Sequence, residues 1–233
     1  MKSVLEQFEI QSAELDSYLI FLKKLEHNST VLVNAESKRE VRGFGDDSFK
    51  VMKASFFLQL YNIIECFTRE AFGQLYETLH NEQLVYEDVS NKIKQVWLDQ
   101  NLAKLTIKTA SPENYHKKCR EVVTDIFDKK KLMLSSRDLP LLGNIDANQI
   151  RSICKIHGIE FKPHYRSRGG GVLETIKEKR NHLSHGNTTF TECGREYTVG
   201  DLERHKRESV IYIRGLLKHI EKYISNKEYT AEI

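Results

Sequence analysis

Several features that mark other protein classes are scarce or missing in this sequence. It has only three prolines and one tryptophan, while leucine, lysine, glutamate and isoleucine abound, and that mixture favours helix. No run of about 18 apolar residues is present, so no segment is expected to span a membrane. The first residues, MKSVLEQFEIQ, carry early acids and no apolar block, so a signal peptide is not expected.

Cysteine is also sparse, and its spacing excludes two kinds of site. The four cysteines stand far apart and form no CxxC pair, so neither a disulfide scaffold nor a zinc ribbon is indicated. They are interpreted as free thiols in a reducing cytoplasm, which is the expected location of the protein. These residues are Cys66, Cys119, Cys154 and Cys193.

The chain has little net charge overall, but positive charge is concentrated in two segments. The 233 residues carry a net charge of +3, which is too small to indicate a nucleic-acid partner. Residues 162–182, however, hold six lysines and arginines against two glutamates, and a second basic cluster, RHKR, follows at 204–207. Such clusters are either a solvated face or a surface that attracts phosphate.

Hydrophobic periodicity predicts an all-α fold in one domain of 1–233. The stretch from 46 to 80 is apolar around much of its circumference, so it is expected to be the central helix, capped by Asp46, Asp47 or Ser48. Residues 188–199 suggest one small β-hairpin turning near Cys193 and Gly194. The expected core helices are 2–27, 46–80, 172–186 and 198–225. The region 84–165 is expected to be an inserted helical region with helices near 86–102, 112–128 and 146–158.

One arginine stands in the apolar stripe of the helix predicted at 172–185. Leu173, Ile176, Arg180 and Leu183 follow a heptad-like spacing, which places Arg180 in an inward-facing position. A buried guanidinium is costly unless an anion receives it. The anion is either an internal carboxylate, for which Glu65 in LYNIIECF is the candidate with Asn62 assisting, or a ligand phosphate. Alternatively, Glu65 lies on a thin exposed strip.

A histidine follows the arginine at the end of the same helix. Asn181 and His185 lie one turn apart on one face, while Arg180 is about 140° away and has a side chain long enough to swing toward the helix end. Imidazole can act as a base near neutral pH, and a guanidinium can hold a charged phosphorane. The pair therefore suits cleavage of a phosphodiester by a ribose 2′-hydroxyl, without a metal or other cofactor.

The wider sequence around this pair resembles the HEPN superfamily. KEKRNHLSHGNTTF carries the Arg-x4-6-His signature as Arg180 and His185, with Asn181 and Gly186 at the flanking positions. LYNIIECFTRE on the earlier helix and GREYTVGDLERH after the motif are similar to the MAE-type branch. The resemblance implies a HEPN-like helical bundle and a metal-independent endoribonuclease that leaves a 2′,3′-cyclic phosphate and a 5′-hydroxyl.

The resemblance also implies roles and partners. Arg180 and His185 would be catalytic, Asn181, Glu65 and Asn62 supporting, and a homodimer would bring two motifs into one cleft. Many such proteins act in phage defence or as toxins, so an operon-encoded regulator is a candidate partner. Some HEPN toxins have a modifiable tyrosine two residues after the histidine, but Asn187 occupies that position here, so this form of regulation is not predicted. The residues expected to contact RNA are Lys162, Arg166, Arg168, Lys177, His182, Arg204, Lys206 and Arg207.

Three alternatives stay open. His182, His185 and Cys193 offer possible zinc ligands, although a fourth ligand is not evident. A HEPN-like bundle can also serve as a non-catalytic RNA-binding or assembly module, which would usually lack the arginine or the histidine. A DNA-binding surface is a third interpretation, but the sequence shows no convincing helix-turn-helix.

Overall fold

The structure, a computed structural model, describes residues 1–26, 33–39, 45–103, 111–139 and 143–231. These residues fold into helices joined by loops, with two isolated β-bridges and no sheet among them. The all-α prediction is therefore confirmed. The elements are α1 (Lys2–Glu26), α2 (Asp46–Asn81), η1 (Tyr86–Asp88), α3 (Asn91–Ala103), α4 (Pro112–Phe127), η2 (Ser136–Asp138), α5 (Ala147–Ile156), η3 (Tyr165–Gly170), α6 (Gly171–Ser184), α7 (Phe190–Arg195) and α8 (Val199–Ser225).

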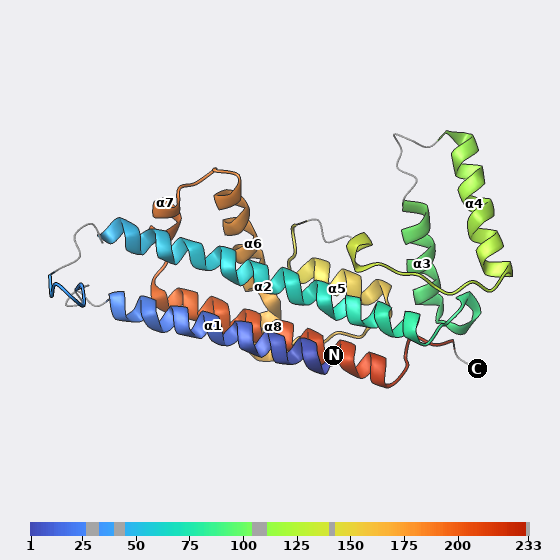
Figure 1. Cartoon of the computed structure of the whole chain (residues 1–233), viewed down its shortest axis with the longest axis horizontal. Helices are drawn as coiled ribbons and strands as arrows, with labels where there is room; N and C mark the ends of the chain where they lie inside the picture. The colour runs from blue at the N-terminus through green and yellow to red at the C-terminus, as the bar shows by residue number, and fades with distance from the viewer. Residues whose placement is uncertain (27–32, 40–44, 104–110, 140–142, 232–233) are drawn as a thin grey trace.

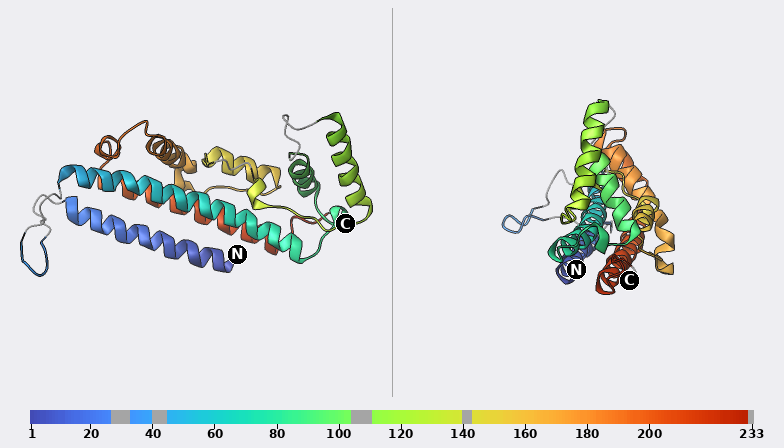
Figure 2. Two further views of the ribbon diagram at one scale, coloured as in Figure 1. Left: turned by 45° about the horizontal axis from the view of Figure 1, so that its top comes forward. Right: turned by 90° about the vertical axis from the view of Figure 1, so that its right-hand side faces the viewer.

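The long helix α2 is the centre of the bundle. It packs against α1, α6, α7 and α8, and the three longest helices, α1, α2 and α8, run side by side along the molecule (Figures 1 and 2). Phe56, Phe57, Phe67 and Phe72 of α2 are fully or almost fully buried, as expected for a helix that is apolar around much of its circumference. At about 25 cal/mol per Å² of apolar surface removed from water, these rings supply much of the drive for assembly.

Helix starts follow the sequence signals closely, with one exception. Thr198 and Asp201 form a capping box at the start of α8, and the Asp146 carboxylate accepts the backbone N–H groups of Asn148 and Gln149 at the start of α5. The expected side-chain cap of α2 is wrong, because Gly45 occupies the cap position. Asp46 lies in the first turn instead. Its negative charge interacts favourably there with the positive end of the helix dipole, and its carboxylate pairs with Lys50.

The predicted hairpin at 188–199 is wrong, because this stretch contains α7. Thr189 and Glu192 form a reciprocal capping box that nucleates the helix. Gly194 permits α7 to approach α2 closely, since an added Cβ would lie 1.9 Å from the Lys50 carbonyl oxygen. The glycine that suggested a turn serves helix packing instead.

The region 84–165 divides into a projecting part and a packed part. Helices α3 and α4 stand away from the long helices at the end of the molecule opposite α7 (Figure 1). In contrast, η2 packs against α2, and α5 packs against α3 and α6. The division into core helices and an insertion stays a prediction, but α5 is an integral neighbour of the helix that carries the Arg-x4-His motif.

Two further findings concern the chemistry of the chain. The four cysteines are unpaired, and two of them, Cys154 and Cys193, are buried. None of the described helices combines the length and the apolar character that crossing a bilayer requires.

Candidate active site

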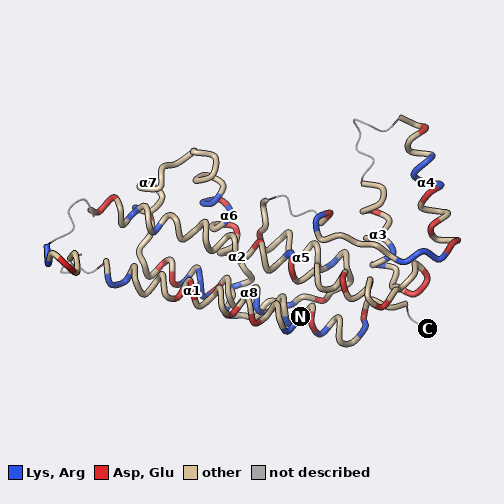
Figure 3. The backbone as a smooth tube through the Cα atoms, viewed as in Figure 1, with Lys and Arg blue, Asp and Glu red and all other residues tan. Residues whose placement is uncertain are grey.

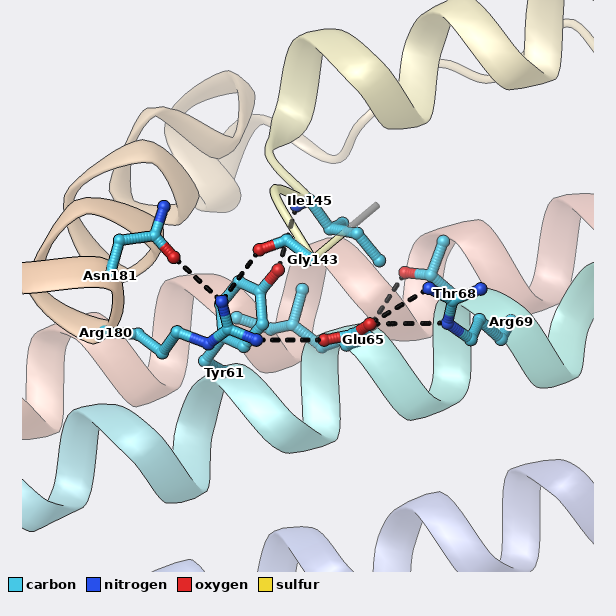
Figure 4. Close-up of polar contacts among 9 residues, drawn as sticks. Tyr61, Glu65, Thr68, Arg69, Gly143, Ile145, Arg180 and Asn181 are labelled. Atoms are coloured by element: carbon cyan, nitrogen blue, oxygen red, sulfur yellow. Dashed lines mark hydrogen bonds and ion pairs between the residues drawn. The ribbon is translucent and has the colours of Figure 1, made fainter. Parts of the chain in front are cut away.

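Arg180 lies at the edge of the apolar face of α6. Val172, Leu173, Ile176 and Leu183 bury that face against the bundle. The Arg180 side chain is 25% exposed, so its position is half-buried rather than fully inward as the heptad spacing predicted. Its guanidinium is directed neither into bulk solvent nor into the centre of the core, but into a polar cluster between α2, α6 and the segment before α5 (Figure 4).

The guanidinium is held on three sides. Nη1 donates to the carbonyl oxygen of Gly143 at 2.9 Å and to Oδ1 of Asn181 at 2.8 Å. The guanidinium carbon lies 4.3 Å from the ring centroid of Tyr61, within the range of a cation–π interaction. Since Nη1 carries two hydrogens, both of its donors are used. The position of the cation is thus fixed by neutral groups.

Glu65 is the one carboxylate of the cluster. Its Oε2 lies 3.7 Å from Nη2 of Arg180, so the predicted pairing is present as an ion pair beyond hydrogen-bond distance. Oε1 of Glu65 accepts a closer hydrogen bond, 3.0 Å long, from Arg69 one turn along α2. Glu65 therefore divides its charge between two arginines. Asn62 is exposed on α2 and makes no hydrogen bond to this cluster among the described residues.

The segment before α5 supplies partners that the sequence analysis missed. The buried hydroxyl of Tyr61 accepts the backbone N–H of Ile145 at 3.0 Å, and burial raises the pKa of Tyr61. Nδ2 of Asn181 donates to Oδ1 of Asn144 at 2.7 Å. These bonds hold residues 143–145 against α2 and α6. The contact of the Tyr61 ring with the cation was not predicted from the sequence.

A salt bridge ties the same segment to α6. Nζ of Lys177 lies 2.7 Å from Oδ2 of Asp146. Burial acts to raise the pKa of Asp146, but the hydrogen bonds from Lys177 and from the first turn of α5 outweigh it and lower the pKa. Lys177 is thereby engaged inside the protein, with a side chain 18% exposed. Its expected contact with RNA gains no support from this position.

The guanidinium keeps donors for a ligand. Neither Nε nor Nη2 of Arg180 donates a hydrogen bond to a described residue, although Glu65 offsets part of the charge. A planar guanidinium with two donors on one edge matches two oxygens of a phosphate. The contacts of Nη1 orient that edge before any ligand arrives, and such preorganisation is the source of electrostatic stabilisation in enzymes.

Helix α6 ends immediately before His185. The Asn187 N–H reaches the His182 carbonyl oxygen at 2.9 Å and the Gly186 N–H reaches that of Leu183 at 3.3 Å, which is the Schellman pattern. Gly186 has φ of +70°, a conformation that favours glycine. The helix was expected to include His185, but it stops at Ser184. His185 caps it and presents an exposed imidazole.

The other basic residues do not form one surface. Basic and acidic residues alternate along the helices (Figure 3). Lys206 pairs with Asp16 and is 11% exposed, and Arg204 pairs with Asp201. Lys162 lies in a different hollow, beside α5. By contrast, Arg166, Arg168 and Arg207, although distant in sequence, line one pocket.

The alternative zinc site finds no assembled ligand set. His182 and His185 are exposed near the end of α6, whereas Cys193 is buried in α7. Within the described part of the chain, no group of three or more histidine, cysteine, aspartate or glutamate side chains is placed to hold a metal ion.

Comparison with known proteins gives one match. The family model described as HEPN_MAE_28990:/-like HEPN matches residues 1–229. No curated protein and no solved structure matches the chain. The family match covers both α2, which carries Tyr61 and Glu65, and α6, which carries Arg180.

Proposed function

This chain belongs to the MAE_28990-like HEPN family, and from that membership we propose that it is a metal-independent endoribonuclease. HEPN domains generally bind RNA and dimerise. The proposed products are a 2′,3′-cyclic phosphate and a 5′-hydroxyl. The observation that carries the proposal is the guanidinium of Arg180, which is fixed through Nη1 and keeps its Nε and Nη2 donors for a phosphate.

The proposed reaction needs a base, an acid and a stabilised phosphorane. His185 removes the proton of the ribose 2′-hydroxyl, and the 2′-oxygen attacks phosphorus. Arg180 donates to the non-bridging oxygens, on which negative charge develops. The bond from phosphorus to the 5′-oxygen then breaks, and that oxygen takes a proton from a second imidazole or from water.

The second imidazole comes from a second protomer. We assign the active form as a homodimer in which two Arg180 and two His185 side chains meet in one cleft. The exposed position of His185 at the tip of α6 supports this arrangement, because an imidazole there is accessible to another chain. The biological setting that we propose is phage defence or toxin action, restrained by a partner encoded in the same operon.

The proposal is tested by incubating the purified chain with total RNA in the presence of a chelator. Cleavage that leaves 2′,3′-cyclic phosphate ends is expected, and Arg180→Ala and His185→Ala are each expected to abolish it while the helical content and the dimer persist. His80→Ala is the matched control, because it removes an exposed histidine in the last turn of α2, away from Arg180 and His185. This variant is expected to cleave normally. Cleavage by His185→Ala at the wild-type rate would refute the assigned role.

The second candidate is a non-catalytic HEPN-like RNA-binding or assembly module. The ion pair with Glu65 favours it, because a neutralised cation suits a structural position as well as a catalytic one. The two functions differ in cells. A nuclease inhibits growth when it is expressed, and mutation of either motif residue relieves the inhibition, whereas a binding module shows neither effect.

A further inference from the structure

A second basic site lies at the opposite end of α6 from His185. Tyr165, Arg166 and Arg168 of η3 and Arg207, Glu208 and Ile211 of α8 line a pocket of about 480 Å³. We propose that this pocket is an RNA-binding exosite, which grips the phosphates of a strand outside the cleavage cleft. The inference rests on the proposed function for its ligand class and on the pocket itself for its location.

The charges in the pocket leave two guanidiniums for an anion. Nε of Arg168 lies 3.5 Å from Oε1 of Glu208, whose side chain is buried. This pair accounts for the one carboxylate of the pocket. Among the described residues, the guanidinium of Arg166 donates a hydrogen bond only to the neutral hydroxyl of Tyr165, and Arg207 has no ion-pair partner. Two uncompensated cations beside this hollow attract phosphates.

The aromatic side chain gives the pocket a preference for nucleotides over simple anions. Tyr165 is 76% exposed, so its ring is accessible to a ligand. Its ring lies 4.5 Å from that of His164, and the guanidinium of Arg166 lies 5.7 Å from its centroid. A nucleobase can extend this stack, as bases do on aromatic residues in single-strand binding proteins.

The loop that forms the pocket is rigid before any ligand binds. The fully buried Ser167 donates from both its hydroxyl and its backbone N–H to the carbonyl oxygen of His164. Arg151 of α5 donates to the carbonyl oxygen of Gly169 at 2.8 Å. The backbone of Arg166 and Arg168 is therefore ordered when the chain folds, so binding of a ligand does not carry that entropy cost.

The position of the pocket defines what it does for the reaction. Residues 165–168 directly precede α6, and Arg180 follows Gly171 by nine residues, which is about 14 Å along a helix. A dinucleotide in the cleft is too short to reach the pocket, whereas a longer strand reaches both. The exosite thus raises affinity for long single-stranded RNA without taking part in the chemistry.

The first test measures binding without cleavage. In the His185→Ala background, fluorescence anisotropy with a labelled single-stranded RNA is compared for the parent, for Arg166→Ala/Arg207→Ala and for Lys218→Ala. Lys218 is the matched control, because it is an exposed cation on α8 that lies outside the pocket. We expect the double variant to bind at least tenfold more weakly, and the slope of log K against log salt to fall by about 1.4, or 0.7 for each lost phosphate contact. The control keeps both values.

The second test separates the exosite from the active site. The double variant is expected to raise the KM for long RNA and to leave cleavage of a ribodinucleotide unchanged. Equal losses on both substrates, unchanged binding, or an equal loss in Lys218→Ala would each overturn the exosite. If the wild-type chain binds RNA through the pocket but cleaves nothing, the exosite stands and the proposed nuclease activity fails.

Discussion

The guanidinium of Arg180 lies 4.3 Å above the ring of Tyr61, and the hydroxyl of the same ring accepts the backbone N–H of Ile145. The buried side chain of Tyr61 therefore contacts the cation with its ring face and holds residues 143–145 through its hydroxyl. That segment contributes the Gly143 carbonyl oxygen that Arg180 also binds. Tyr61 thus links the two restraints on the guanidinium.

Tyr61→Phe is expected to keep the ring and lose the hydroxyl. The buried N–H of Ile145 then lacks an acceptor, which costs about 1–3 kcal/mol of unfolding free energy. The rate constant kcat falls as well, because Gly143 is no longer held in place. Urea denaturation and RNA cleavage measure the two effects. Tyr18→Phe is the control, since its hydroxyl donates to Met52 far from the site, and a matching fall in kcat there would contradict the argument.

Glu65→Gln is expected to change activity more than stability. Glutamine keeps an acceptor for Arg69 but removes the charge that faces Nη2 of Arg180. A change of about 1 kcal/mol in transition-state stabilisation corresponds to less than a tenfold change in kcat. Steady-state cleavage measures it, with Glu70→Gln, an exposed position on α2, as the control. Complete inactivation would show that Glu65 reacts directly with the substrate.

Gly186→Ala is expected to disturb the end of α6. A non-glycine residue at φ of +70° costs about 1–2 kcal/mol, and relief of that strain displaces His185. Gly200→Ala in the first turn of α8 is the control, because its φ is not positive and an added Cβ meets only Thr198 at 3.7 Å. Thermal unfolding and cleavage are measured together. Normal activity in Gly186→Ala would show that the Schellman ending does not position the imidazole.

His157 is expected to make stability depend on pH. Its Nδ1 bonds to the Ile153 carbonyl oxygen at 2.7 Å and its Nε2 to the Tyr76 hydroxyl at 2.6 Å, and burial lowers its pKa to about 4. Since a carbonyl only accepts, Nδ1 carries the proton and Nε2 accepts from Tyr76.

The unfolded chain protonates this histidine below about pH 6.5, whereas the folded chain stays neutral down to about pH 4. Stability is therefore full above pH 6.5 and falls as the pH drops, by up to about 3 kcal/mol. Urea denaturation between pH 7 and pH 5 measures the slope. His157→Gln should be less stable but should lose most of the slope, and an unchanged slope would assign it to other groups.

The sequence predicted the helices well because their signals are local. The apolar stripes of α2 and the box formed by Thr198 and Asp201 operate within a few residues, and both are present in the structure. The hairpin prediction failed because Gly194 was interpreted by its usual turn preference. Its actual constraint, contact with Lys50, comes from a helix far away in the chain.

The candidate site was predicted only in part for a similar reason. The pairing of Arg180 with Glu65 followed from two charges placed in apolar stripes, and the structure contains it. The contacts of Arg180 with Gly143 and of Asn181 with Asn144 were not foreseen. A sequence pattern does not indicate which backbone carbonyl or loop amide a side chain will bind. These partners are known only when the packing of α5 against α6 is known.

The placement of the cation's support on α2 has a consequence for turnover. Tyr61 and Glu65 emerge from successive turns near the middle of a 36-residue helix that several other helices clamp. Local fraying starts at helix ends and reaches such turns last. The contacts that orient the guanidinium therefore persist for as long as the bundle itself does, so under the proposed function an RNA phosphate meets a charge whose orientation was set when the chain folded.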